Sequence, residues 1–200
     1  MNPALPVLLS LLLIKTIPGP WVGTTTIPVT IPAVATKSLR QPGDATAWTA
    51  DLIRFRTALL SHDKKTVKSF FHFPILDKGN DIWFVADNHL VTKLNQRETV
   101  PFTETDFDQY YNSILAIDFR KTLEKIDVNQ LAKTHRAKST EIEIVPGSKS
   151  FMIATWDQAH NLLTLEIFSK SPGFGQFSFQ YHFTISNETT ITFKEITVIM

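Results

Sequence analysis

Cysteine is absent from the chain. Disulfide bonds, thiolate catalysis, zinc sites built on cysteine and a lipid anchor on cysteine are therefore excluded. The 6 histidines form no His-Glu-x-x-His, no His-x-His and no pair four residues apart, so no metal site is predicted. A Gly-x-Ser-x-Gly motif and a phosphate-binding loop are also missing. We expect no cofactor, and no residue carries a catalytic signature.

The chain also has little net charge. Its 20 basic and 19 acidic residues give a formal charge of +1 and are mixed along the sequence. The 15 phenylalanines could stack on bases, but basic residues are not interleaved with them in the segments that carry them. Nothing in this balance favours a polyanion, so we predict no nucleic-acid partner.

Long apolar runs are missing as well. Residues 5–14, LPVLLSLLLI, are uncharged and precede Lys15, whereas a membrane-spanning helix needs about 20 apolar residues. Such a run is typical of the apolar core of a signal peptide, although no Lys or Arg comes before it. Residues 33–35, Ala-Val-Ala, are the best candidate for cleavage. We expect an exported protein, periplasmic or extracellular, with no membrane span after processing; the alternative is a retained apolar segment or a misplaced start codon.

Residues 16–42 are rich in proline, threonine and alanine and show no sustained helical or strand period. Their prolines favour extended backbone and remove hydrogen-bond donors. We therefore divide the chain into a signal peptide with its Pro/Thr-rich exit segment (1–35), a linker (36–46) and a single α+β domain (47–200). The overall hydrophobic content of 43% is enough for a core of ordinary size.

The domain opens with two predicted helices. Leu52, Phe55 and Leu59 recur at helical spacing, and Asp63 is placed to cap a second, shorter helix. The stretch FFHFPI (70–75) then combines aromatic residues with a proline that disfavours helix before it. We interpret this stretch as the packed end of the helix, with His72 just off the apolar stripe; the alternative makes His72 an acid, a base or a ligand.

Further elements follow before residue 140. The run IWFVA (82–86) is predicted as a short buried strand. Thr103 and Asp106 fit a capping box for a helix that continues to about residue 115. Residues 119–138 are charged and leave helix and strand open.

After residue 140 the pattern becomes that of antiparallel strands. Residues 140–145, 150–156, 162–168 and 177–185 read as strands, and the last of these alternates aromatic and polar residues with a period of two. In the final strand the phase of the apolar residues slips at Lys194 and Glu195, which predicts a β-bulge. The fold class is thus α+β: a strongly curved antiparallel sheet wrapped around N-terminal helices, forming a cone with a central cavity.

Three segments resemble the nuclear transport factor two-like, or cystatin-like cone, superfamily: FRTALLSHDKKTVKSFFHFPI, DFDQYYNSIL and FSFQYHFTISNETTITFKEITVI. The resemblance covers roughly residues 48–199, and within the superfamily it is to a group of small exported bacterial proteins of unknown function. The resemblance implies a cavity between helices and sheet. It does not choose a function, because the superfamily holds isomerases, dehydratases, hydrolases and non-catalytic binding or dimerisation modules.

The predicted cavity has aromatic walls that could bury an apolar ligand. Its lining is predicted to be Phe55, Phe71, Tyr111, Phe177, Phe179, Tyr181 and Phe183. The favoured function is an exported, non-catalytic domain that binds a small apolar ligand, or a protein partner, through this cavity or the open sheet face, which is also a candidate surface for a homodimer. One alternative is an isomerase- or dehydratase-type enzyme, for which Glu166 is the weak candidate base. The other is a structural or assembly module.

Overall fold

The computed structural model describes residues 47–77, 79–87, 98–171 and 175–199. The predictions for residues 1–46 lie outside this part of the chain. The described helices and strands follow one another in the order α1 (Ala47–Leu60), α2 (Lys64–Lys68), α3 (Asp81–Ala86), α5 (Glu104–Ile114), α6 (Ile117–Glu124), α7 (Val128–Thr134), β1 (Arg136–Lys138), β2 (Ile142–Val145), β3 (Ser148–Asp157), β4 (Leu162–Ser171), β5 (Gly175–Ser186) and β6 (Thr190–Ile199). None of these helices is long and apolar enough to cross a membrane.

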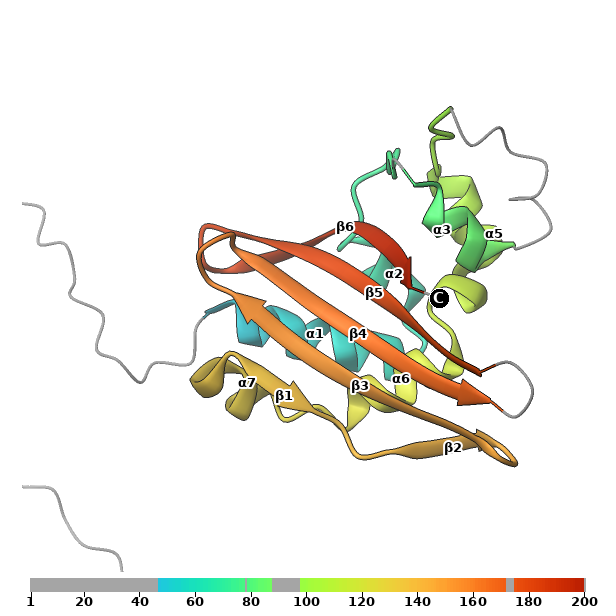
Figure 1. The fold of residues 1–200 in the computed structure, drawn as a ribbon. Coiled ribbons are helices and arrows are strands. Elements are labelled where there is room, and N and C mark those ends of the chain that lie inside the picture. The colour runs from blue at the N-terminus through green and yellow to red at the C-terminus, as the bar shows by residue number, and fades with distance from the viewer. Residues whose placement is uncertain (1–46, 78, 88–97, 172–174, 200) are drawn as a thin grey trace, which may run out of the picture. The chain divides into compact units, whose positions relative to one another are not determined.

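The strands form one antiparallel sheet in the order β1-β3-β4-β5-β6, and β2 pairs with another part of β3 (Figure 1). Helices and antiparallel strands occupy separate stretches of the chain, which confirms the α+β class. The sheet is not strongly curled. The fold therefore bears out the predicted mixture of elements but does not establish the strongly curved cone.

The alternation predicted for 177–185 is present in β5. Tyr181, Phe183 and Ile185 are buried on the inner face, which carries the core, and the polar residues between them lie on the outer face. His182 pairs with Glu195 whereas Phe183 pairs with Phe193, so one residue of β6 is left over between the two pairs. The predicted β-bulge is thereby confirmed, and it explains why the apolar phase slips.

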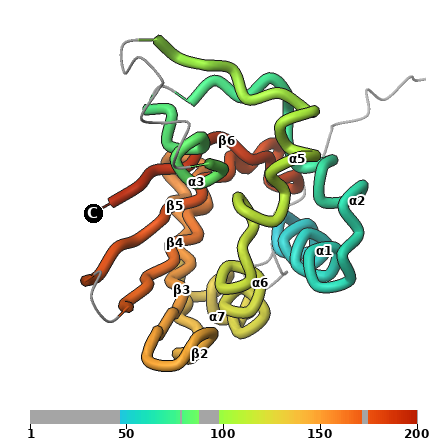
Figure 2. Tube along the Cα trace, turned by 90° about the vertical axis from the view of Figure 1, so that its right-hand side faces the viewer, coloured from blue at the N-terminus to red at the C-terminus, as the bar shows by residue number. Residues whose placement is uncertain are grey.

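The helices cover the inner face of the sheet. Viewed along the sheet, α1, α6 and α7 lie on one side of the strands (Figure 2), and they pack against β3, β4 and β6. Leu52, Phe55 and Leu59 of α1 are completely buried there, as the spacing predicted. On the outer face, Thr164, Glu166 and other polar residues remain partly exposed. The sheet is thus two-faced, with one face in the core and one toward solvent.

Amides on the outer edge of β6 donate hydrogen bonds to the helical part of the chain. The amide of Phe193 donates to the carbonyl of Phe70 (2.8 Å), and the amide of Ile191 donates to the carboxylate of Asp51 (3.0 Å). The amide of Val198 donates to the carboxylate of Asp81, again at 3.0 Å. Edge amides satisfied in this way cannot recruit another strand. The last of these bonds also fixes the start of α3 against the end of the sheet.

One predicted element is wrong: the run at 82–86 is a helix, α3, and not a strand. A buried apolar run of five residues has no period that separates the two structures. Asp77 favours the helix here. Its carboxylate accepts hydrogen bonds from the amides of Gly79 (3.2 Å) and Ile82 (2.8 Å), and it thereby satisfies donors at the start of the helix. The ambiguous stretch 119–138 resolves into most of α6, all of α7 and β1.

Candidate ligand-binding pocket

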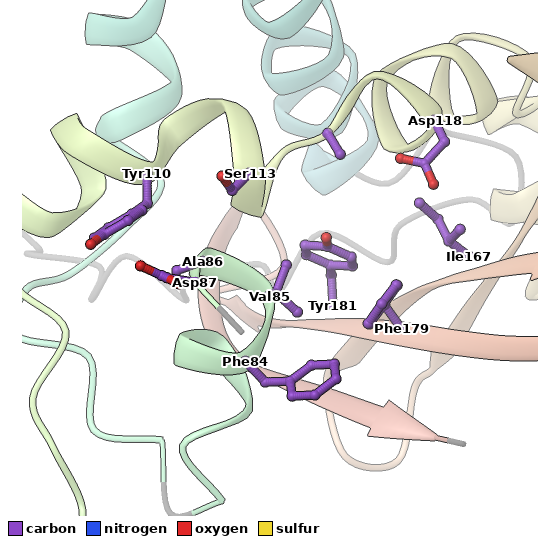
Figure 3. Close-up of a pocket in the computed structure, with 11 residues that line it drawn as sticks. Phe84, Val85, Ala86, Asp87, Tyr110, Ser113, Asp118, Ile167, Phe179 and Tyr181 are labelled. Atoms are coloured by element: carbon purple, nitrogen blue, oxygen red, sulfur yellow. The ribbon is translucent and has the colours of Figure 1, made fainter. Parts of the chain in front are cut away.

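A pocket of about 450 Å³ opens between α3, the end of α5, the start of α6 and the inner face of the sheet (Figure 3). This volume is within the range of small-molecule sites. The residues that line it are Phe84, Val85, Ala86, Asp87, Tyr110, Ser113, Ala116, Asp118, Ile167, Phe179 and Tyr181. Ala86, Ile167 and Tyr181 are buried, and most of the others are half-buried, so the pocket has a closed floor and a rim that reaches solvent.

The α3 wall is held by a dense set of local contacts. Asn80 adopts left-handed backbone (φ 55°), and its side chain accepts a hydrogen bond from the amide of Val100 at 2.9 Å. The indole of Trp83 donates to the carbonyl of Val100 (3.0 Å) and packs edge-on against Phe102, with ring centroids 5.0 Å apart. With the far side of α3 fixed in this way, Phe84 and Val85 are left to face the pocket (Figure 3).

The second wall is the last turn of α5. This helix begins with the predicted capping box, which is confirmed: Thr103 accepts from the amide of Asp106, and Asp106 accepts from the amide of Thr103. At the other end of the helix, Tyr110 and Ser113 line the pocket. The carbonyl of Ile114, which helix geometry leaves without an amide partner, accepts a hydrogen bond from the hydroxyl of Tyr181 at 2.8 Å.

The floor of the pocket comes from β4 and β5. Ile167 is opposite Phe179 in the sheet register, so their side chains lie next to each other on the inner face. The ring of Tyr181 packs against Phe119 of α6 with centroids 4.4 Å apart. Burial raises the pKa of the Tyr181 hydroxyl, and the negative charge of Asp118 raises it further. Tyr181 is therefore a neutral hydrogen-bond donor whose partner is the end of α5.

Among the described residues that line the pocket, the charged ones are Asp87 and Asp118, and none is Lys, Arg or His. Asp118 lies in the first turn of α6, where one carboxylate oxygen accepts from the amide of Phe119 at 2.9 Å. The hydroxyl of Ser169 donates to the other oxygen over a long 3.4 Å. The carboxylate lies beside Tyr181 and Ile167 in Figure 3. The pocket thus combines aromatic walls with negative charge.

The structure brings two of the predicted pocket residues, Phe179 and Tyr181, to the pocket. Phe177 is half-buried next to Phe179, with ring centroids 5.4 Å apart. The remaining four predicted residues lie in the packed core: Phe55, Phe71, Tyr111 and Phe183. Phe55 contacts Phe183 at 5.3 Å between centroids.

Phe71 and Tyr111 both pack against Phe107, with ring centroids 4.7 Å and 5.5 Å from it. The space expected between these rings and the sheet is filled by the rings themselves. The pocket lies further along the sheet, toward α3 and the start of α6.

Glu166, the weak candidate for a catalytic base, lies on the outer face of β4. The neighbouring Ile167 faces the pocket, so the alternation of the strand turns Glu166 away from it. Its carboxylate accepts a hydrogen bond from the hydroxyl of Ser178 at 3.0 Å. His72 is exposed, as its position off the apolar stripe predicted. His182, on the polar outer face of β5, is half-buried.

Several pocket residues were missed from sequence. Phe84 and Val85 were assigned to a strand, and Tyr110 was passed over in favour of its neighbour Tyr111. One sequence signal was available for Asp118: it is a carboxylate just after a short break between two helical patterns, and the helix dipole favours a carboxylate in the first turn of a helix. That signal indicates a helix start, however, and carries no information about a pocket.

The described residues contain no group of three or more His, Asp or Glu side chains arranged to hold a metal ion. Comparison of the chain with protein-family models, with curated proteins and with solved structures finds no match. The pocket is therefore the feature from which a function has to be argued.

Proposed function

We propose that the chain is an exported, non-catalytic domain that binds a small apolar ligand in the pocket between α3, α5, α6 and the sheet. The observation that carries this proposal is a pocket of about 450 Å³ with aromatic walls and a closed floor. Phe84, Tyr110 and Phe179 supply half-buried aromatic surface, and a ligand that covers it gains the free energy of apolar burial.

The same pocket gives less support to the alternatives. An isomerase-type enzyme needs a carboxylate beside the reacting atoms, and Glu166 lies on the other face of the sheet. Asp118 would have to take that role. The hydroxyl of Tyr181, the nearby acid, already donates a hydrogen bond to the carbonyl of Ile114. A purely structural module has no need of an open pocket.

We also propose membership of the nuclear transport factor two-like superfamily, with the cone-shaped cavity that it implies. The support is the arrangement of helices on one face of an antiparallel sheet that ends in the β5-β6 hairpin. A protein partner on the outer face remains the second candidate. Its support is the stacked pair Phe151 and Phe168, whose ring centroids lie 4.9 Å apart on that face.

The test is a thermal-shift screen of neutral apolar small molecules, followed by titration calorimetry with the strongest hit. Ser113→Phe places a large side chain in the pocket, and it should weaken binding about tenfold or more because the walls supply most of the contact area. Gln109→Phe is the matched control, since Gln109 is exposed on the same helix one turn earlier and does not line the pocket. No hit at all, or equal affinity in wild type and Ser113→Phe, would refute the proposal.

A further inference from the structure

The charged side chains that line the pocket within the described residues, Asp87 and Asp118, are both acidic, and this narrows the class of ligand further than the aromatic walls do. Asp118 is half-buried, and within the described part of the chain no Lys, Arg or His nitrogen lies within 4.0 Å of its carboxylate. Its hydrogen bonds are the contact with the amide of Phe119 and the long one with Ser169. The carboxylate therefore lines the pocket, and no basic side chain of the described residues pairs with its charge.

The surroundings of Asp118 add to this preference. The faces of aromatic rings attract cations, and in Figure 3 Phe179 and Tyr181 are the rings on the same side of the pocket as Asp118, whereas Tyr110 lies on the opposite side. The last turn of α5 contributes Tyr110 and Ser113 to the lining, and the carbonyl end of a helix carries partial negative charge. The carboxylate of Asp118 and the aromatic rings on its side of the pocket therefore favour positive charge at this end of the pocket.

We infer that the pocket takes an amphiphilic organic cation: a protonated amine on an apolar or aromatic body. The ammonium group lies beside Asp118, and the body lies against Phe84 and Phe179. This inference rests on the proposed function and narrows it from apolar ligands to this class. An anion of the same size is repelled by Asp118, and a neutral analogue forgoes the attraction.

The experiment compares three probes of one shape: 4-phenylbutylamine, 4-phenylbutan-1-ol and 4-phenylbutanoate. Titration calorimetry at pH 7 with the full chain should rank them in that order, with the ammonium about tenfold tighter than the alcohol. The near-neutral charge of the protein, +1, gives no long-range reason for such a ranking.

Two variants locate the effect. Asp118→Asn should bring the ammonium to within about twofold of the alcohol, because the neutral amide keeps the shape and loses the charge. Glu166→Gln removes a carboxylate from the opposite face of β4 and should preserve the wild-type ratio.

The outcomes separate this inference from the proposed function. If the alcohol binds but the ammonium binds no tighter, or if the preference survives in Asp118→Asn, the cation assignment is overturned and apolar binding stands. If none of the three probes binds, both proposals fail. Should Asp118→Asn not fold, the ranking of the probes on the wild-type protein still decides.

Discussion

His182 lies on the outer face of β5 between two threonines of the neighbouring strands. Its Nδ1 is 3.1 Å from the hydroxyl of Thr164, and its Nε2 is 3.3 Å from the hydroxyl of Thr197. Burial lowers the pKa of this imidazole below its ordinary value of 6.5, partly opposed by the negative charge of Glu195. A polar position in an alternating strand is thus not always a solvated one, because cross-strand neighbours can cover it.

This environment predicts a pH dependence of stability. The folded protein holds His182 neutral, so its contribution is fully present above the unfolded pKa of about 6.5 and is lost as the pH falls through the lower folded pKa. The free energy of unfolding should therefore decrease between pH 7 and pH 5. Denaturant unfolding of wild type and His182→Gln measures it. The variant should lose less stability on acidification, since the other histidines titrate in both proteins; parallel curves would contradict the assignment.

At the scale of an element, the segment that follows α2 connects the helical layer to the sheet. Phe71 is 5% exposed, stacks on Phe193 at 4.6 Å between centroids and forms a parallel bridge with it. His72, the next residue, is exposed. Of these two neighbours, Phe71 is the one whose side chain joins the helical layer to the edge of the sheet.

Phe71→Ala should cost about 3–5 kcal/mol of unfolding free energy, because it leaves a cavity among packed rings. His72→Ala should cost less than about 1 kcal/mol, as changes at exposed positions usually do. Chemical denaturation of both variants gives the comparison. Similar losses for the two would mean that the packed face of this segment has been misjudged.

The elements that could be predicted are those whose signal is local and repeated. The alternation in β5, the slip of phase in β6 and the capping box of α5 each depend on residues within a few positions of one another. The short run that forms α3 offers no such repetition. Its helix depends on Asp77 at one end and on the bond from the amide of Val198 to Asp81, which joins residues 117 positions apart.

At the scale of the whole domain, the pocket is a product of topology. Its walls come from residues 84–87, from four residues between 110 and 118, and from Ile167, Phe179 and Tyr181 of the sheet. The placement of α3 against the end of β6 decides where the first of these segments lies. Sequence patterns predicted which strand face would be aromatic, and Phe179 and Tyr181 do line the pocket. They could not show that Phe55, Phe71 and Phe183 would pack against other rings and close the remaining space.

The central claim is that a small molecule binds on the inner face of the sheet beside α3. The most direct measurement is a set of intermolecular nuclear Overhauser effects between the strongest neutral binder and the methyl groups of the labelled protein. Val85 and Ile167 line the pocket, whereas Ile153 is half-buried on the outer face of the same sheet. The account predicts contacts from the ligand to the methyl groups of Val85 and Ile167 and none to Ile153. Contacts to Ile153 without any to Val85 and Ile167 would place the ligand on the outer face and contradict it.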